Sequence, residues 1–340
     1  MRFRYFRAID GLKVCSIFLG LCIIPAILDG CRESWRQGLV AARPNVTFQG
    51  QALGGLLPQE VYVVVERLAT DLQMAPLEAT LDQETGGVIP ELNGYQVNVE
   101  ETVSAILAAR SGTQVAPVFR EVPSAVTLAA FPERAIYRGR PERGQVAFLV
   151  NVAWGNEYLP ELLQALREVE AGATFFLVGR WVRQYPDLAV TIREAGFELA
   201  NHGYSDAVSL GRVGVSDVRE EIAKGAATIK AVCGVYPTYF SPHKGELTEK
   251  VLQAASLENS RVIMWTVDTV DWKLPGVEKM VQKVLAKAEG GSMVLMHPTA
   301  QTAEFVRLTV PALRKSGLHP VSVSELLCPS RMPRSAGAMR

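Results

Sequence analysis

Histidine and aspartate side chains recur just after short apolar runs in the second half of this 340-residue chain. Three of its four histidines lie at such positions, which random placement would rarely produce. They are His202, His243 and His297, and the carboxylates among them are Asp206, Asp268 and Asp271. Histidine and aspartate are zinc ligands, and a His–carboxylate pair serves catalysis and architecture equally well.

The apolar runs alternate with helical patterns, which predicts parallel strands joined by crossover helices. The predicted strands cover residues 146–152, 173–178, 197–200, 239–240, 262–267, 292–296 and 320–327. The predicted helices cover residues 159–166, 186–195, 215–232, 247–255, 277–288 and 302–316. The fold class is therefore α/β, a barrel or a doubly wound sheet. In a β/α barrel, catalytic groups stand at the carboxyl ends of the strands.

Five segments of this half resemble the polysaccharide deacetylase family, carbohydrate esterase family 4. They are residues 146–166 with 173–176, Asn201-His202 through Asp206, residues 265–272, and Leu295-Met296-His297, in the family's order. The resemblance implies a distorted (β/α)7 barrel over residues 144–328. It also implies hydrolysis of acetyl groups on peptidoglycan, chitin or xylan, a reaction on C–N bonds when the acetyl is amide-linked. In this family a divalent metal, usually Zn²⁺, is bound by one Asp and two His.

Several positions depart from the family pattern. The paired aspartates of the first motif, a base and a metal ligand, correspond to Ala153 and Trp154. Asp206 stands where the second metal histidine belongs, and Ser241 replaces the third-motif arginine. The residues that protonate the leaving group in this family are retained. The resemblance implies that His297 is the proton donor and that Asp268 and Asp271 are its fourth-motif partners. Alternatively, His297 belongs to a structural network with these carboxylates.

A reduced metal site remains a hypothesis. His202, Asp206 and His243 would hold zinc or another divalent ion, since three protein ligands and a water form a workable catalytic set. The alternative is a hydrogen-bonded His202 and a turn or N-cap Asp206. At the same rim Trp154, Tyr204 and Trp272 suit stacking on sugar rings, although aromatic residues at strand ends also serve as core.

The N-terminus predicts export. Arg2, Arg4, Arg7 and Lys13 precede an apolar run at residues 14–28, the order of a secretory or anchor signal. Residues 1–31 are therefore expected to be a cleaved signal or a membrane anchor, and acylation of Cys31 is an alternative. Lysine plus arginine equals aspartate plus glutamate at 35 each, so nothing indicates a nucleic-acid partner.

Residues 45–123 are predicted to form a small α/β domain. Residues 54–60, 82–86 and 92–95 resemble a peptidoglycan-binding domain often found in exported Gram-positive proteins; a spacer without ligand is the alternative. We expect a linker at 124–143 and a tail at 329–340. Three functions remain open: an active deacetylase with a rebuilt site, an inactive glycan-binding barrel, and a structural or protein-partner role in the envelope.

Overall fold

The computed structural model describes residues 41–331, so the predicted leader at residues 1–31 lies outside the described residues. The described chain folds into a pair of compact units, one from residues 41–75 and 94–122 and the other from residues 76–93 and 123–331. None of the helices between residues 41 and 331 is both long and apolar enough to cross a bilayer.

The first unit is a small α/β body. Its helices α2 (Pro58–Leu72) and α3 (Val99–Ala108) pack on each other around a core that includes Val61 and Ile106. Its strands are β1 (Thr47–Phe48), β2 (Gln51–Ala52), β5 (Gly94–Val97), β6 (Gln114–Val115) and β7 (Phe119–Val122). β1 pairs with β2 and β6, and β5 pairs with β7.

The second unit is built on one curled sheet whose strand pairs are all parallel, in the order β12-β11-β10-β9-β8-β14-β13, with β15 also paired to β8. The strands are β8 (Gln145–Val152), β9 (Thr174–Leu177), β10 (Glu198–Asn201), β11 (Tyr239–Phe240), β12 (Arg261–Val262), β13 (Val267–Asp268), β14 (Met293–Met296) and β15 (His319–Val321). The predicted α/β barrel-type fold is confirmed.

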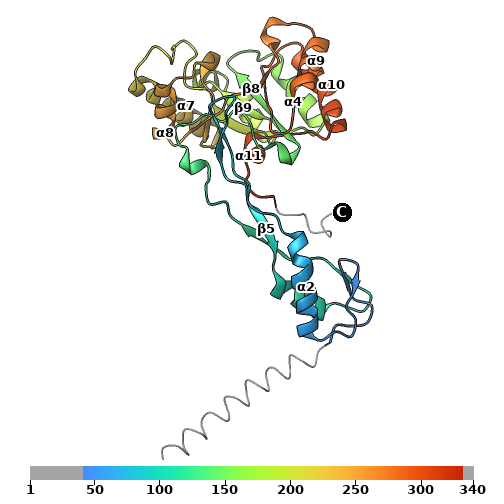
Figure 1. The fold of residues 1–340 in the computed structure, drawn as a ribbon. Coiled ribbons are helices and arrows are strands. Elements are labelled where there is room, and N and C mark those ends of the chain that lie inside the picture. The colour runs from blue at the N-terminus through green and yellow to red at the C-terminus, as the bar shows by residue number, and fades with distance from the viewer. Residues whose placement is uncertain (1–40, 332–340) are drawn as a thin grey trace, which may run out of the picture. The chain divides into compact units, whose positions relative to one another are not determined.

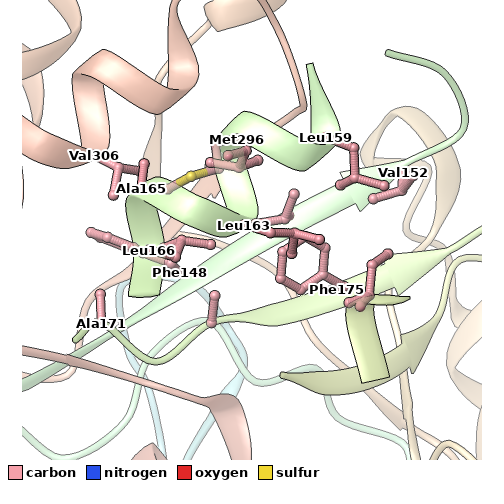
Figure 2. Packing of buried hydrophobic residues seen from close by; sticks show 14 of the residues in the cluster. Phe148, Val152, Leu159, Leu163, Ala165, Leu166, Ala171, Phe175, Met296 and Val306 are labelled. Carbon is pink, nitrogen blue, oxygen red and sulfur yellow. The ribbon is translucent and has the colours of Figure 1, made fainter. Parts of the chain in front are cut away.

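Helices flank this sheet, with α7 and α8 to one side of β8 and β9 and α4, α9 and α10 to the other (Figure 1). Their bounds are α4 (Leu159–Glu168), α5 (Gly179–Gln184), α6 (Pro186–Glu194), α7 (Val215–Cys233), α8 (Glu249–Leu257), α9 (Val277–Lys287), α10 (Thr302–Lys315) and α11 (Val323–Leu326). Figure 2 shows Phe148 of β8 and Phe175 of β9 packed with Leu163 of α4 in the main core. Burial on both faces explains the almost unbroken apolar sequence of β8.

The predicted domain boundaries do not match this division. Residues 76–93 carry the hairpin of β3 (Thr80–Leu81) and β4 (Val88–Ile89), which belongs to the barrel unit and not to a continuous 45–123 domain. The Val88 amide donates to the Ala135 carbonyl at 2.9 Å. The guanidinium of Arg138 contacts both Asp82 oxygens, at 2.7 and 2.9 Å, and lowers the pKa of Asp82 to about 2.

The predicted linker at 124–143 also belongs to the barrel unit. Ile136 is fully buried and pairs in parallel with Ile263, while Arg138 bridges to Ser292. These bridges place the segment beside β12 and β14 at the open seam of the sheet. One predicted strand, 262–267, is two short strands, because β12 pairs with β11 and β13 pairs with β14.

Candidate functional site

A pocket of about 490 Å³ opens where the loops that follow the parallel strands converge. Most of the residues singled out in the sequence line it: Trp154, His202, Asp206, His243, Asp268, Trp272 and His297. Carboxyl ends of neighbouring parallel strands meet at one edge, so the topology itself gathers these side chains.

The turn after β10 brings two of the histidines together. Gly203 has a φ of +80°, and its amide donates to Asn201 Oδ1 at 2.9 Å. A Cβ at Gly203 would lie 2.7 Å from Nε2 of His243, so only glycine permits this approach. The rings of His202 and His243 consequently meet edge to face, with centroids 4.6 Å apart.

Both rings are held in a form that resists protonation. Nδ1 of His202 lies 2.7 Å from the Ser241 carbonyl oxygen, to which it donates. Burial, and then the neighbouring His243, hold the pKa of His202 well below its usual value. Burial likewise lowers the pKa of His243 to about 4, against the opposing attraction of Asp206 and Glu246.

These shifts predict a fold that weakens in mild acid. A histidine with a lower pKa in the folded chain than in the unfolded chain, here about 4 against 6.5, favours unfolding as it takes up protons. We expect the free energy of unfolding to be fully retained above about pH 6.5 and to fall towards about pH 4. Urea titrations across this range should show a shallower decline for His243→Gln, and an unchanged slope would contradict the assignment.

On the other side of the pocket, His297 and Asp271 form a closed pair. Asp271 is 0% exposed and accepts from the His297 amide at 2.5 Å and from its Nδ1 at 2.8 Å. The Thr302 hydroxyl donates to the same carboxylate at 3.2 Å. The carboxylate therefore fixes both the ring and the backbone of His297. Asp268, the other predicted partner, instead accepts from the Val270 amide at 2.8 Å.

Trp154 lies parallel to the His297 ring, with centroids 5.6 Å apart and 9° between the planes. The loop can approach because Gly155 has a φ of +81°, and a Cβ there would clash with the Pro298 carbonyl oxygen. Trp154 is 44% exposed and Trp272 is 53% exposed. Two partly solvated indole rings are thus available at the rim.

Tyr204 does not line the pocket, contrary to the prediction. The Lys224 ammonium lies 4.1 Å from the centroid of the Tyr204 ring, and the Tyr204 hydroxyl accepts a hydrogen bond from Arg183 at 3.2 Å. Arg183 is on α5 and Lys224 on α7, so Tyr204 serves the packing of these helices. Alternation explains the miss: His202 turns towards the pocket, and the positive φ of Gly203 redirects the chain after it.

The residues present do not fit the family's divalent metal. Trp154 stands at the position of the metal aspartate, and the exposed Asp206 at that of a histidine. Between residues 41 and 331 no group of three or more His, Cys, Asp or Glu side chains is arranged to hold a metal ion. The structure therefore brings His202 and His243 together without completing the predicted metal set with Asp206.

The sequence analysis assigned no role to four residues that line the pocket: Asn151, Lys244, Trp265 and Leu295. Asn151 lies within β8, and strand alternation places it one step before the expected strand end. Lys244 follows His243 in a short turn and has a φ of +55°, which few non-glycine residues adopt. Trp265 lies in the irregular stretch between β12 and β13, where the apolar pattern predicts one continuous strand.

Residues 138–263 match the family model for polysaccharide deacetylase. Uncharacterized protein YlxY of Bacillus subtilis is 33% identical over 272 residues, which cover 80% of this chain and 85% of that protein. The crystal structure of BA3943 from Bacillus anthracis, a carbohydrate esterase family 4 pseudoenzyme, is 32% identical with a TM-score of 0.69. It covers 80% of this chain and 96% of that one. A BA3943 mutant of the same similarity is described as having restored enzymatic activity.

A peptidoglycan-N-acetylglucosamine deacetylase of Bacillus cereus is 27% identical over 200 residues, covering 57% of this chain and 72% of that protein. The chain belongs to the polysaccharide deacetylase family, carbohydrate esterase family 4. Deacetylases of this family are generally metal-dependent.

Proposed function

We propose that this chain is an exported cell-envelope protein that binds a hexosamine-containing wall glycan through its barrel pocket without hydrolysing it. The observation that carries the proposal is the state of the pocket. Its shape, its indole rim and the Asp271–His297 pair are present, whereas Ala153 and Trp154 occupy the positions of the base and of one metal ligand. The relation to a pseudoenzyme and to a peptidoglycan deacetylase supports this combination.

Trp154 is the expected platform for the sugar. Its face is parallel to His297 on one side and partly exposed, and an indole in this position stacks on the apolar face of a pyranose. Trp272, also partly exposed, would bound the same cleft. Hydrolysis is not expected, because the lining supplies neither the family base nor its full set of metal ligands.

Sedimentation with purified peptidoglycan tests this function. We expect the full-length protein to co-sediment and Trp154→Ala to bind about 10-fold more weakly, since stacking aromatics are energetic centres of such contacts. Tyr236→Ala is the matched control, because Tyr236 is an aromatic residue 49% exposed and absent from the pocket lining. Equal loss in both variants, or none in Trp154→Ala, would place the glycan elsewhere, for example on residues 45–123.

The proposal of export rests on the apolar run at residues 14–28 and the arginine and lysine residues before it, and retention of residues 1–31 would make them a membrane anchor. Protease added to intact wall-less cells of a Gram-positive host should digest the barrel. Full protection until the cells are lysed would contradict an external location.

A further inference from the structure

The pocket carries negative charge that the protein itself does not neutralise. Asp206 and Asp268 both line it, and no ion pair found within residues 41–331 involves either. Lys244 is the one lysine or arginine among the lining residues. It is exposed, and its charge also interacts with Glu246.

The wall of the pocket also contains a buried acceptor that has no donor. Asn151 is 6% exposed and lines the pocket, and its Oδ1 has no hydrogen-bond partner within the described residues. Buried polar atoms are nearly always paired, so the Asn151 acceptor indicates a ligand that brings an N–H or O–H donor.

Two forms of an amino sugar differ in what they offer here. An acetamido group is uncharged, supplies one N–H and adds a carbonyl that itself needs a donor. A free sugar amine is protonated, supplies three N–H donors and carries the positive charge that the two carboxylates lack. The second form matches both the uncompensated charge and the unpaired Asn151 Oδ1.

We propose that the pocket recognises a hexosamine unit whose amine is free, that is, a de-N-acetylated unit of the wall glycan. The proposal rests on the proposed function and narrows its ligand: the sugar ring lies on Trp154, and the ammonium faces Asp268, Asp206 and Asn151. Amide hydrolysis by an active deacetylase must supply this ligand. The chain would then bind what that class of reaction produces.

Tryptophan fluorescence titration of the full-length protein, with Trp154, Trp265 and Trp272 as reporters, measures the preference. The probes are the tetramer of N-acetylglucosamine and the fully de-N-acetylated tetramer, both at about pH 6. We expect the amine form to bind at least ~10-fold more tightly and to weaken as salt is raised. Asp268→Asn retains the oxygen that accepts from Val270 and should abolish most of this preference. Asp206→Asn should reduce it, and Asp187→Asn, an exposed aspartate outside the lining, should leave it unchanged.

Tetralysine, a cation without sugar rings, should bind much more weakly than the amine tetramer. Equal binding of tetralysine would overturn the proposal, because charge alone would then explain the affinity. Equal or tighter binding of the acetylated tetramer would also overturn it while leaving the glycan-binding function in place. Binding of neither tetramer would reject both.

Discussion

The parent protein is expected to take up no zinc and to release no acetate from chitin oligomers or peptidoglycan above a buffer blank. The triple variant Ala153→Asp, Trp154→Asp and Asp206→His should bind about one Zn²⁺ per chain. The physical reason is that these changes rebuild one aspartate and two histidines around an open position for water, which is the family's ligand set. Metal analysis after dialysis measures the difference.

Turnover is expected to need a fourth change, Ser241→Arg, which restores the residue that positions the base. Loss of a catalytic base alone removes ~10²–10⁴ in rate, so the contrast between parent and variant should be large. Ser241 is only 1% exposed, and an arginine there must find room. For this reason zinc uptake is measured without it, and circular dichroism of each variant verifies folding.

Asp206→His alone is the control for adventitious zinc, because it adds a histidine without the aspartate. A folded triple variant that binds no more zinc than this single variant would show that the geometry around the pocket has also changed. Robust acetate release by the parent, abolished by His202→Ala, would instead establish a metal site built from the residues present.

Asp271→Ala is expected to destabilise the protein by about 3–5 kcal/mol, the range for removing one partner of a buried ion pair or its hydrogen-bonded equivalent. The carboxylate is 0% exposed and accepts from the backbone and ring of His297 and from Thr302. Its removal leaves the amide and the ring nitrogen of His297 without their partner, while the Thr302 hydroxyl keeps the His297 carbonyl oxygen at 2.7 Å. Guanidinium denaturation measures the loss.

The matched control is Asp187→Ala, since Asp187 is an exposed aspartate at the start of α6. Its cost should stay within about 0.5 kcal/mol apart from a small helix-dipole contribution. Asp271→Asn should lie between the two, because its remaining oxygen still accepts. A loss for Asp271→Ala no larger than that of the control would contradict the central role of this carboxylate.

The sequence predicted the site where it depended on strand ends. His202, Asp268 and His297 follow apolar runs, and parallel topology brings such positions to one edge. The prediction failed where contacts between residues far apart in the sequence determine the position of a side chain. Tyr204 occupies a plausible rim position, yet Arg183 and Lys224 hold it between helices. The segment containing Ile136 has the composition of a linker but fills the seam beside Ile263.

The orientation of the Trp154 ring could not be predicted from the sequence. Its type marks the loss of an acidic residue, but its parallel placement on His297 depends on the contact between Gly155 and Pro298, which lie in loops far apart in the sequence. Asn151 was given no role because the sequence of a strand buried on both faces does not show which face meets the pocket. The net charge of the pocket could not be predicted either, because its charged lining residues, Asp206, Lys244 and Asp268, come from three separate loops.

The turn after β10 is stabilised by residues that are separate from the reacting positions. Asn201 holds it from both ends, accepting from Gly203 and donating to the Ile222 carbonyl at 2.8 Å, and Gly225 leaves the space that the turn needs. None of these groups takes part in hydrolysis. The side chains of Ala153 and Ser241 make none of these hydrogen bonds, so the residues that would react and the residues that shape the turn are separate sets. Because catalysis and the fold depend on different residues, a protein of this kind can lose catalysis and keep its pocket for recognition.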